Sequence, residues 1–226
     1  MLGLPDTIGA CLFDLDGVLT RTAAQHATAW KEMFDDFLRR WSERTGDPQQ
    51  PFELPRDYDE YVDGKPRLSG VQSFLRSREI ELALGSPEDP PDADTEQGLG
   101  NRKNELVLEL IRSGGVEVFE GSVRYVEAVR DCGLRCAVVS SSKNCREVLV
   151  AARIDHLFEA VIDGAVAERE GLPGKPAPDT FLAGARALQT DAPRAAVFED
   201  ALAGVEAGRA GNFVVVADLA ELLQAP

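Results

Sequence analysis

Five short runs of the chain are almost continuously apolar, and they constrain the fold more than any other feature. Parallel strands that are covered on both faces have this composition. Segments with helical periodicity lie between the runs, which predicts an α/β fold, a doubly wound parallel sheet with helices on both faces. The runs are IGACLF (8–13), RCAVVS (135–140), EAVID (159–163), AAVFE (195–199) and FVVVA (213–217).

Residues from about 24 to 114 interrupt this alternation. They contain helical patterns and two loop-like segments, 44–61 and 85–100, the second rich in proline, glycine and acidic residues. We therefore predict a catalytic core formed by residues 1–23 and 115–226, with a mainly helical cap domain, residues 24–114, inserted after the first strand. Loops of this length are often lids or specificity loops, and a solvated excursion is the alternative.

Charge and composition exclude several classes of partner. The formal net charge is −15, which argues against nucleic acid or an anionic membrane surface as a partner. No apolar run approaches the roughly 20 residues of a membrane helix, and no basic segment precedes the first apolar run. Four cysteines without a CxxC pair and only two histidines favour reduced thiols over a disulfide or zinc framework. We expect a cytoplasmic monomer.

Polar side chains follow the predicted strands at the points where the strands end. In an open parallel sheet, ligands bind beyond the carboxyl ends of the strands, so these side chains are expected to meet. They are Asp14 and Asp16 after the first run, Ser140, Ser141 and Ser142 after the second, Lys175 after the third, and Glu199 and Asp200 after the fourth.

Four carboxylates in one place require a cation. Mg²⁺ fits because it prefers oxygen ligands and keeps positions open for water and a substrate phosphate. Ca²⁺ fits less well, since no calcium-loop spacing is present. A serine hydroxyl, a lysine and the amides of the SSSKN turn would complete a phosphate-binding site beside that metal.

Two carboxylates one residue apart suit phosphoryl transfer. Asp14 would act as the nucleophile, once a metal neutralises the charge between it and the phosphate. Asp16 would act as general acid and base, protonating the leaving oxygen and activating the acceptor. For an isolated DxD sequence the alternative is a solvated turn or simple metal binding.

Four motifs resemble those of the haloacid dehalogenase superfamily: FDLDGVLT, VVSSS, GKPAPD and FEDALAG. The resemblance covers roughly residues 8–23 and 115–217, and it implies a Rossmann-like core, a mobile cap and an aspartyl-phosphate intermediate. It also implies the ligands of the site. Mg²⁺ would be bound by Asp14, the backbone carbonyl of Asp16, Glu199 and Asp200, and the phosphoryl group by Ser140 and Lys175.

A narrower resemblance is to the β-phosphoglucomutase-like group, carried by TRTAAQHATAW, DGKPR, NRKN and SSSKN. In that group a cap arginine grips the distal phosphate, and here it would be Arg67. Taken singly, His26 could be a structural residue, and Arg67 or Lys103 a solvated charge. The substrate-binding residues that the resemblance implies are Thr22, His26, Arg67, Lys103, Ser142 and Asn144.

Three positions depart from the pattern of that group. Arg21 stands where an acid is expected, Ala201 where a serine follows the acidic pair, and Glu120 where a proline precedes Gly121. The acidic segments also make the cap longer. These departures bear on the choice of sugar and leave the core motifs intact.

The sequence leaves three hypotheses. The first is a Mg²⁺-dependent phosphosugar mutase that interconverts β-D-glucose 1-phosphate and glucose 6-phosphate through an aspartyl-phosphate and a sugar bisphosphate. The second is a phosphatase of a small phosphorylated metabolite with the same catalytic residues. The third is a catalytically silent binding protein, which metal-dependent turnover of any phosphoester would exclude.

Overall fold

A computed structural model describes residues 2–217. Its five strands form one sheet in the order β3-β2-β1-β4-β5, and every neighbouring pair is parallel. The prediction of a doubly wound parallel sheet is therefore confirmed. The strands are β1 (Ala10–Phe13), β2 (Arg135–Val139), β3 (Ala160–Ile162), β4 (Ala195–Phe198) and β5 (Val214–Val216).

The central strand β1 sets the register of the sheet. Phe13 is paired with Val138 of β2 on one side and with Phe198 of β4 on the other. All four residues of β1 are fully buried, as the apolar run predicts. Because the strands are parallel and in register, the residues that follow them emerge at the same edge of the sheet.

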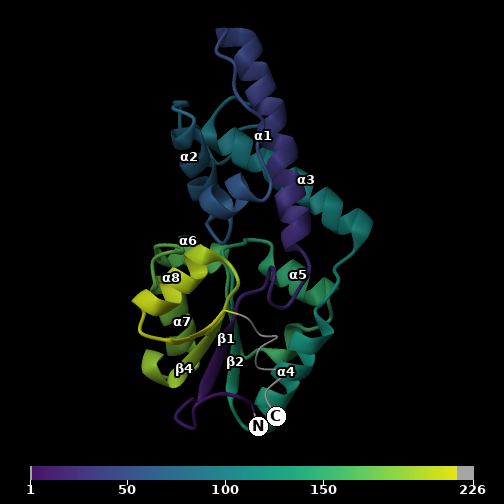
Figure 1. The fold of residues 1–226 in the computed structure, drawn as a ribbon. Helices are drawn as coiled ribbons and strands as arrows, with labels where there is room; N and C mark the ends of the chain where they lie inside the picture. The colour runs from purple at the N-terminus through teal and green to yellow at the C-terminus, as the bar shows by residue number, and fades with distance from the viewer. Residues whose placement is uncertain (1, 218–226) are drawn as a thin grey trace. The chain divides into compact units, whose positions relative to one another are not determined.

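Helices cover both faces of the sheet, with α7 and α8 on one side and α4 and α5 on the other (Figure 1). Helix α4 ends just before Gly133, whose φ of +82° lies in the left-handed region that favours glycine. The short helix α6 was not predicted; the side chain of Asp163 caps it by accepting from the amide of Val166. These helices are α4 (Glu120–Asp131), α5 (Cys145–Ala151), α6 (Gly164–Glu170), α7 (Asp179–Ala187) and α8 (Leu202–Ala210), with single 3₁₀ turns at Asp155–Leu157 and Ala192–Arg194.

The chain divides into two compact units. The sheet unit comprises the described residues up to Arg21, residues 64–66, and the described residues from Val116 onward. The helical unit comprises residues 22–63 and 67–115. Assigning them as catalytic core and cap stays a prediction.

The helical unit is built around an aromatic core in which Phe34 packs against Phe52 and Phe74, with ring centroids 5.3 and 4.1 Å away. Large buried side chains of this kind supply most of the stabilisation of a small helical domain. Its helices are α1 (Ala23–Thr45), the π-helix η1 (Tyr58–Val62), α2 (Arg67–Ser77) and α3 (Glu96–Gly114).

Both segments predicted as loops prove partly helical. Helix α3 begins at Glu96, inside the predicted loop 85–100, where the side chain of Thr95 accepts from the amide of Gly98. Glycine disfavours helix, but a Cβ at Gly98 would lie 2.3 Å from the Ala93 carbonyl oxygen, so close packing requires glycine here. The other segment contains η1.

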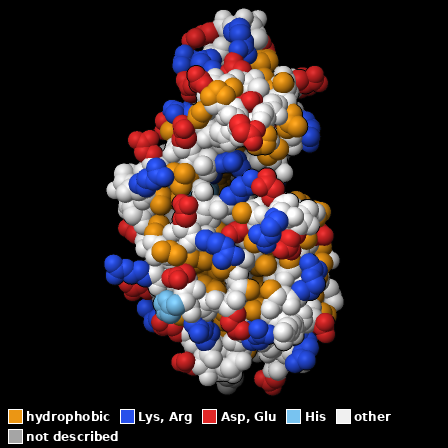
Figure 2. Space-filling view, turned by 180° about the vertical axis from the view of Figure 1, so that it is seen from behind, with side chains coloured by type: hydrophobic (Ala, Val, Ile, Leu, Met, Phe, Trp, Pro, Cys, Tyr) orange, Lys and Arg blue, Asp and Glu red, His pale blue; other side chains and the backbone are white. Residues whose placement is uncertain are grey.

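The charged side chains at the surface and the cysteines are arranged as the composition of the chain leads us to expect. Figure 2 shows acidic and basic side chains interspersed on one face of the molecule. All four cysteines are free thiols, and Cys11 and Cys136 are buried in the sheet. Across residues 2–217, none of the helices has both the length and the apolar character needed to cross a membrane.

Candidate active site

Asp14 lies at the end of β1 and is buried. Its backbone amide donates to the Phe198 carbonyl at 2.9 Å, which holds the residue beside β4. The chain then turns at Gly17, where φ is +94° and a Cβ would lie 1.9 Å from a carboxylate oxygen of Asp200. The turn therefore requires glycine, and it brings Asp200 close to the end of β1.

Lys175 links two carboxylates inside the sheet unit. Its ammonium donates to Asp14 at 2.5 Å, to Glu199 at 2.8 Å and to the Val139 carbonyl at 3.3 Å. Burial alone would lower the pKa of Lys175, but the charges of Asp14 and Glu199 outweigh it and raise that pKa above its ordinary value. The lysine is thus a fixed cation at this edge of the sheet.

The carboxylates outnumber that cation. Ligand oxygens of Asp14, Glu199 and Asp200 all lie within 4.8 Å of one another. Burial raises the pKa of Asp14 and of Glu199; their mutual repulsion also raises that of Glu199, while Lys175 opposes the rise in both. Among the described residues, nothing donates to the buried Oε1 of Glu199. Excess negative charge and an unsatisfied buried oxygen fit a hard divalent cation.

Asp16 lies next to Asp14, as predicted. Its backbone amide donates to the Asp14 carboxylate, and its side chain is only partly buried. The turn is closed by Thr20, whose hydroxyl and amide both donate to the Leu15 carbonyl, at 3.1 and 2.9 Å. These contacts fix the backbone of the turn that carries Asp16.

The Ser140 turn is the second polar element at this edge. Ser140 is buried, and its hydroxyl accepts from the amide of Ser142 at 3.1 Å. The hydroxyl of Ser142 in turn accepts from the amide of Asn144 at 3.2 Å. These contacts shape the turn that leads into α5. Because Phe13 is in register with Val138, Ser140 emerges near Asp14.

The predicted cap residues lie in the helical unit. Nδ1 of His26 contacts the ammonium of Lys103 at 2.9 Å, and Lys103 lies over the Trp30 ring, 5.0 Å from its centre. Burial, and then the charge of Lys103, hold the pKa of His26 well below its ordinary range. Because an ammonium group can only donate, Nδ1 of His26 is the acceptor in this contact, which a neutral imidazole with its proton on Nε2 provides.

Two further residues that were predicted to bind the substrate, Thr22 and Arg67, stand at helix starts. Thr22 is buried just before α1, and its carbonyl accepts from the amide of His26 at 2.9 Å. Arg67 begins α2 and lies along α3, where a Cβ on Gly100 would be 3.6 Å from its Nε. Thus the structure brings His26 and Lys103 into contact, and places Thr22 and Arg67 in the same unit. Their placement toward Asp14 stays a prediction.

Sequence reasoning missed two glycines that shape the acidic cluster. One is Gly17, described above. The other is Gly204, where a Cβ would lie 2.0 Å from the carboxyl carbon of Glu199. Both stand inside motifs that were singled out, but their importance depends on close approach in three dimensions, which the motif alone does not reveal.

The departures Arg21 and Glu120 line one cleft of about 560 Å³ in the sheet unit, which also reaches Glu199 and Asp200. The guanidinium of Arg21 lies 4.4 Å from the centre of the Phe119 ring. The third departure, Ala201, is buried. Arg21 and Glu120 therefore share a cleft with the acidic pair, and Ala201 directly follows that pair in the chain.

Comparisons with known proteins agree with the motifs. Residues 8–212 match the model of the haloacid dehalogenase-like hydrolase family. The chain is 55% identical over 216 residues to the β-phosphoglucomutase of Mycobacterium tuberculosis (strain CDC 1551 / Oshkosh), covering 96% of this chain and 82% of that protein. It is 31% identical to the β-phosphoglucomutase of Bacillus subtilis, covering 91% and 81%.

A solved structure agrees on the fold. The β-phosphoglucomutase of Clostridium difficile superposes with a TM-score of 0.71 at 24% identity, covering 92% of this chain and 83% of that one. The family match and the identity to full-length relatives extend over nearly the whole chain. The chain therefore belongs to the haloacid dehalogenase-like hydrolase family and, within it, to the β-phosphoglucomutase-like phosphotransferases.

Proposed function

We propose that this protein is a Mg²⁺-dependent phosphosugar mutase that interconverts β-D-glucose 1-phosphate and glucose 6-phosphate. The observation that carries the proposal is the buried Asp14 carboxylate, held by Lys175 beside an acidic pair. It stands in a chain 55% identical to a β-phosphoglucomutase. The enzyme would act as a monomer.

Asp14, the backbone carbonyl of Asp16, Glu199 and Asp200 would hold Mg²⁺. When bound, the ion supplies positive charge that lowers the repulsion between the Asp14 carboxylate and a phosphate. The unsatisfied Oε1 of Glu199 and the three converging carboxylates support this assignment.

The reaction would begin with Asp14 carrying a phosphoryl group. Asp16 takes the proton from the 6-hydroxyl of β-glucose 1-phosphate, whose oxygen attacks phosphorus as the bond to the Asp14 carboxylate breaks. The resulting bisphosphate turns round and presents its 1-phosphate. Asp14 attacks that phosphorus, Asp16 returns the proton to the leaving oxygen, and glucose 6-phosphate departs.

Further residues would bind the substrate. Ser140 and Lys175 would hold the oxygens of the transferring phosphoryl group, and Lys175 is already fixed against Asp14. Arg67 would grip the other phosphate, because its planar guanidinium donates two parallel hydrogen bonds. Ser142 and Asn144 would contact the substrate from the turn before α5, and Thr22, His26 and Lys103 from the helical unit.

A phosphatase is the second candidate, because the match is to a hydrolase family and because Arg21 and Glu120 depart from the mutase pattern beside the acidic pair. The two differ in the acceptor. A mutase must keep water from the Asp14 phosphoester, whereas a phosphatase must admit it.

The test is a two-product assay. The protein is incubated with β-glucose 1-phosphate and catalytic glucose 1,6-bisphosphate, with Mg²⁺ or with EDTA, and both glucose 6-phosphate and inorganic phosphate are measured. We expect rapid glucose 6-phosphate formation that needs Mg²⁺, with slow phosphate release. Rapid phosphate release from many phosphosugars without any isomer would favour the phosphatase.

A further inference from the structure

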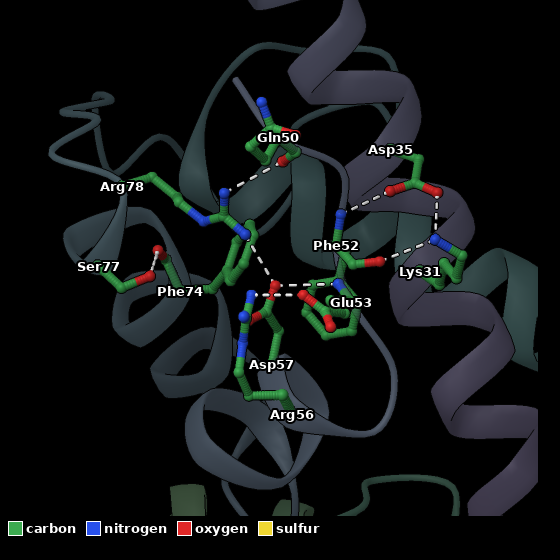
Figure 3. A network of polar contacts seen from close by, with 10 residues as sticks. All are labelled: Lys31, Asp35, Gln50, Phe52, Glu53, Arg56, Asp57, Phe74, Ser77 and Arg78. Carbon is green, nitrogen blue, oxygen red and sulfur yellow. Dashed lines mark hydrogen bonds and ion pairs between the residues drawn. The ribbon is translucent and has the colours of Figure 1, made fainter. Parts of the chain in front are cut away.

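The helical unit contains an excursion whose two ends are joined by an ion pair. Residues 58–77 form η1, a short connection and α2. Asp57 directly precedes this excursion and Arg78 directly follows it. Nη2 of Arg78 donates to Oδ2 of Asp57 at 2.7 Å (Figure 3).

The carboxylate of Asp57 is buried and fully engaged. The residue is only 2% exposed. Besides Arg78, its Oδ2 accepts from the amide of Glu53 at 3.0 Å, and its Oδ1 accepts from Nε of Arg56 at 3.1 Å. Both oxygens are therefore satisfied by protein groups, which makes this carboxylate a structural anchor and leaves no open position for a ligand.

The planar guanidinium group of Arg78 makes further contacts on two sides. Nη1 donates to the Gln50 carbonyl at 3.1 Å, and the guanidinium carbon lies 4.9 Å from the centre of the Phe74 ring. Phe74 belongs to α2, so Arg78 joins the end of the excursion both to its own helix and to the loop before Asp57. A lysine could not make these directed contacts together.

The loop before Asp57 is itself fastened to α1. The amide of Phe52 donates to Asp35 at 2.8 Å, and the ammonium of Lys31 donates to the Phe52 carbonyl at 2.8 Å (Figure 3). The base of the excursion is thus held to the longest helix of the unit, through contacts that do not involve the far end of the excursion.

The far end carries the residues of functional interest. Residues 64–66 group with the sheet unit, where the Gly64 carbonyl accepts from the hydroxyl of Ser141 at 2.8 Å. Arg67, the residue proposed to grip the distal phosphate, comes next in the chain. The π-helix η1 leads from Asp57 to this end of the excursion. Helices of this type are rare and often lie at functional sites.

From this geometry we infer that Asp57 and Arg78 are positioning residues for the mutase reaction. By closing the base of the excursion, the pair holds the start of α2 in one position relative to α1 within the helical unit, and so places the guanidinium of Arg67. This inference rests on the proposed function for its effect on catalysis. Its structural part does not.

The test compares Arg78→Met with Arg78→Lys and with Asp94→Asn. Arg78→Met keeps most of the aliphatic part of the side chain but removes the guanidinium group. Arg78→Lys keeps the positive charge without the planar guanidinium. Asp94→Asn is the matched control, because Asp94 pairs in the same unit with Arg40 at 2.9 Å and with Arg44, and neither arginine belongs to residues 57–78. For each folded variant, isomerisation, hydrolysis of p-nitrophenyl phosphate and amide hydrogen exchange over residues 58–66 are measured.

We expect Arg78→Met to raise KM for the phosphosugar at least about tenfold, the scale of one lost directed contact. Hydrolysis of p-nitrophenyl phosphate should stay within about twofold. Arg78→Lys should recover part of the loss, and Asp94→Asn should resemble the wild type. Equal losses in both reactions, or unchanged kinetics in a folded Arg78→Met protein, would overturn the inference.

Hydrogen exchange separates this inference from the proposed function. If the wild type isomerises no phosphosugar, the proposed function fails, yet faster exchange over residues 58–66 in Arg78→Met than in Asp94→Asn still supports the positioning role. Equal exchange in the two variants would refute that role whatever the enzyme's substrate.

Discussion

Two buried charge clusters, one around Lys175 in the sheet unit and one around Asp57 in the helical unit, are built in opposite ways. In the sheet unit, Lys175 is the cation that contacts Asp14 and Glu199, a further carboxylate lies within reach, and one oxygen of Glu199 has no donor among the described residues. In the helical unit, Asp57 is shared by two arginines and a backbone amide. The first cluster has excess charge and an open position, whereas the second is balanced and closed.

This difference distinguishes a cluster that can bind a ligand from a cluster that only stabilises the fold. A buried carboxylate with all its hydrogen bonds satisfied has nothing further to offer a ligand, and removing its partner mainly costs stability. A cluster of excess carboxylates costs stability as it stands, and a bound cation recovers it. Variants of the two clusters should therefore respond differently in activity, and in opposite directions in stability.

The largest expected effect is on the nucleophile. Asp14→Asn removes the attacking carboxylate, and we expect turnover to fall by at least about 10⁴-fold, as for other covalent catalysts. Steady-state isomerisation and single-turnover labelling with a radioactive phosphoryl donor would measure it. Asp36→Asn, on the exposed face of α1, is the control and should leave turnover unchanged. Substantial activity or labelling in Asp14→Asn would contradict the covalent scheme.

The next effect concerns the neighbouring carboxylate. Asp16→Ala should slow phosphoryl transfer by about 10²–10⁴-fold, the usual contribution of a general acid and base. Mg²⁺ affinity, measured by calorimetry, should change little, because the contribution of Asp16 to the metal is predicted to come from its backbone. A rate close to the wild type would show that another group moves the proton.

Stability should then distinguish the two clusters. Asp57→Asn leaves Arg78 without its charged partner, and we expect the free energy of unfolding to fall by about 3 kcal/mol. Denaturant unfolding would measure the loss. Asp36→Asn again serves as the control, because exposed pairs contribute less than about 1 kcal/mol. A loss no larger than that of the control would mean that the buried pair is not an anchor.

In the absence of metal, Glu199→Gln should change the free energy of unfolding in the direction opposite to that of Asp57→Asn. Burial and the charge of Asp14 raise the pKa of Glu199, so the fold disfavours the ionised form of this side chain. We expect the variant to be more stable than the wild type in EDTA by about 1 kcal/mol. Mg²⁺ should raise the melting temperature of the wild type but not of the variant. Destabilisation in EDTA would mean that Lys175 needs both carboxylates.

The smallest expected effect is on pH dependence. The fold lowers the pKa of His26 below its ordinary value of about 6.5. The contribution of His26 to the free energy of unfolding is therefore present above about pH 6.5 and is lost as the pH falls toward the lowered pKa. Unfolding free energies of the wild type and of His26→Gln, compared from pH 7.5 to pH 5, should therefore converge at low pH. Parallel curves would mean that His26 titrates normally.

The sequence allowed the sheet and the acidic cluster to be predicted because both depend on local patterns. Each strand is an apolar run, and the polar residues directly after β1, β2 and β4 meet because the strands are parallel and in register. Predicted strand ends ran over by one or two residues; for example, Ile8 and Gly9 precede β1, although the amide of Gly9 donates to the Arg194 carbonyl.

The balanced cluster could not be predicted in the same way. Asp57 stands in a polar loop and Arg78 follows a helix, so each looks like a solvated charge until the aromatic core brings them together. The beginning of α3 was hard to predict for a similar reason. Gly98 and Gly100 lower helix propensity, and only the three-dimensional structure shows that Ala93 excludes a Cβ at Gly98.

The central position of β1 has a consequence for the order of folding during synthesis. Ala10 pairs with Arg135 and with Ala195, so the first strand to be made cannot complete its hydrogen bonds until the ribosome has produced most of the chain. The helical unit, by contrast, ends at Gly115 and needs mainly residues already made. The helical unit should therefore fold first, while β1 remains an exposed apolar segment until β2 and β4 have been made. Pulse-labelling hydrogen exchange during refolding would reveal this order, because the amides of α1 should become protected before those of β1.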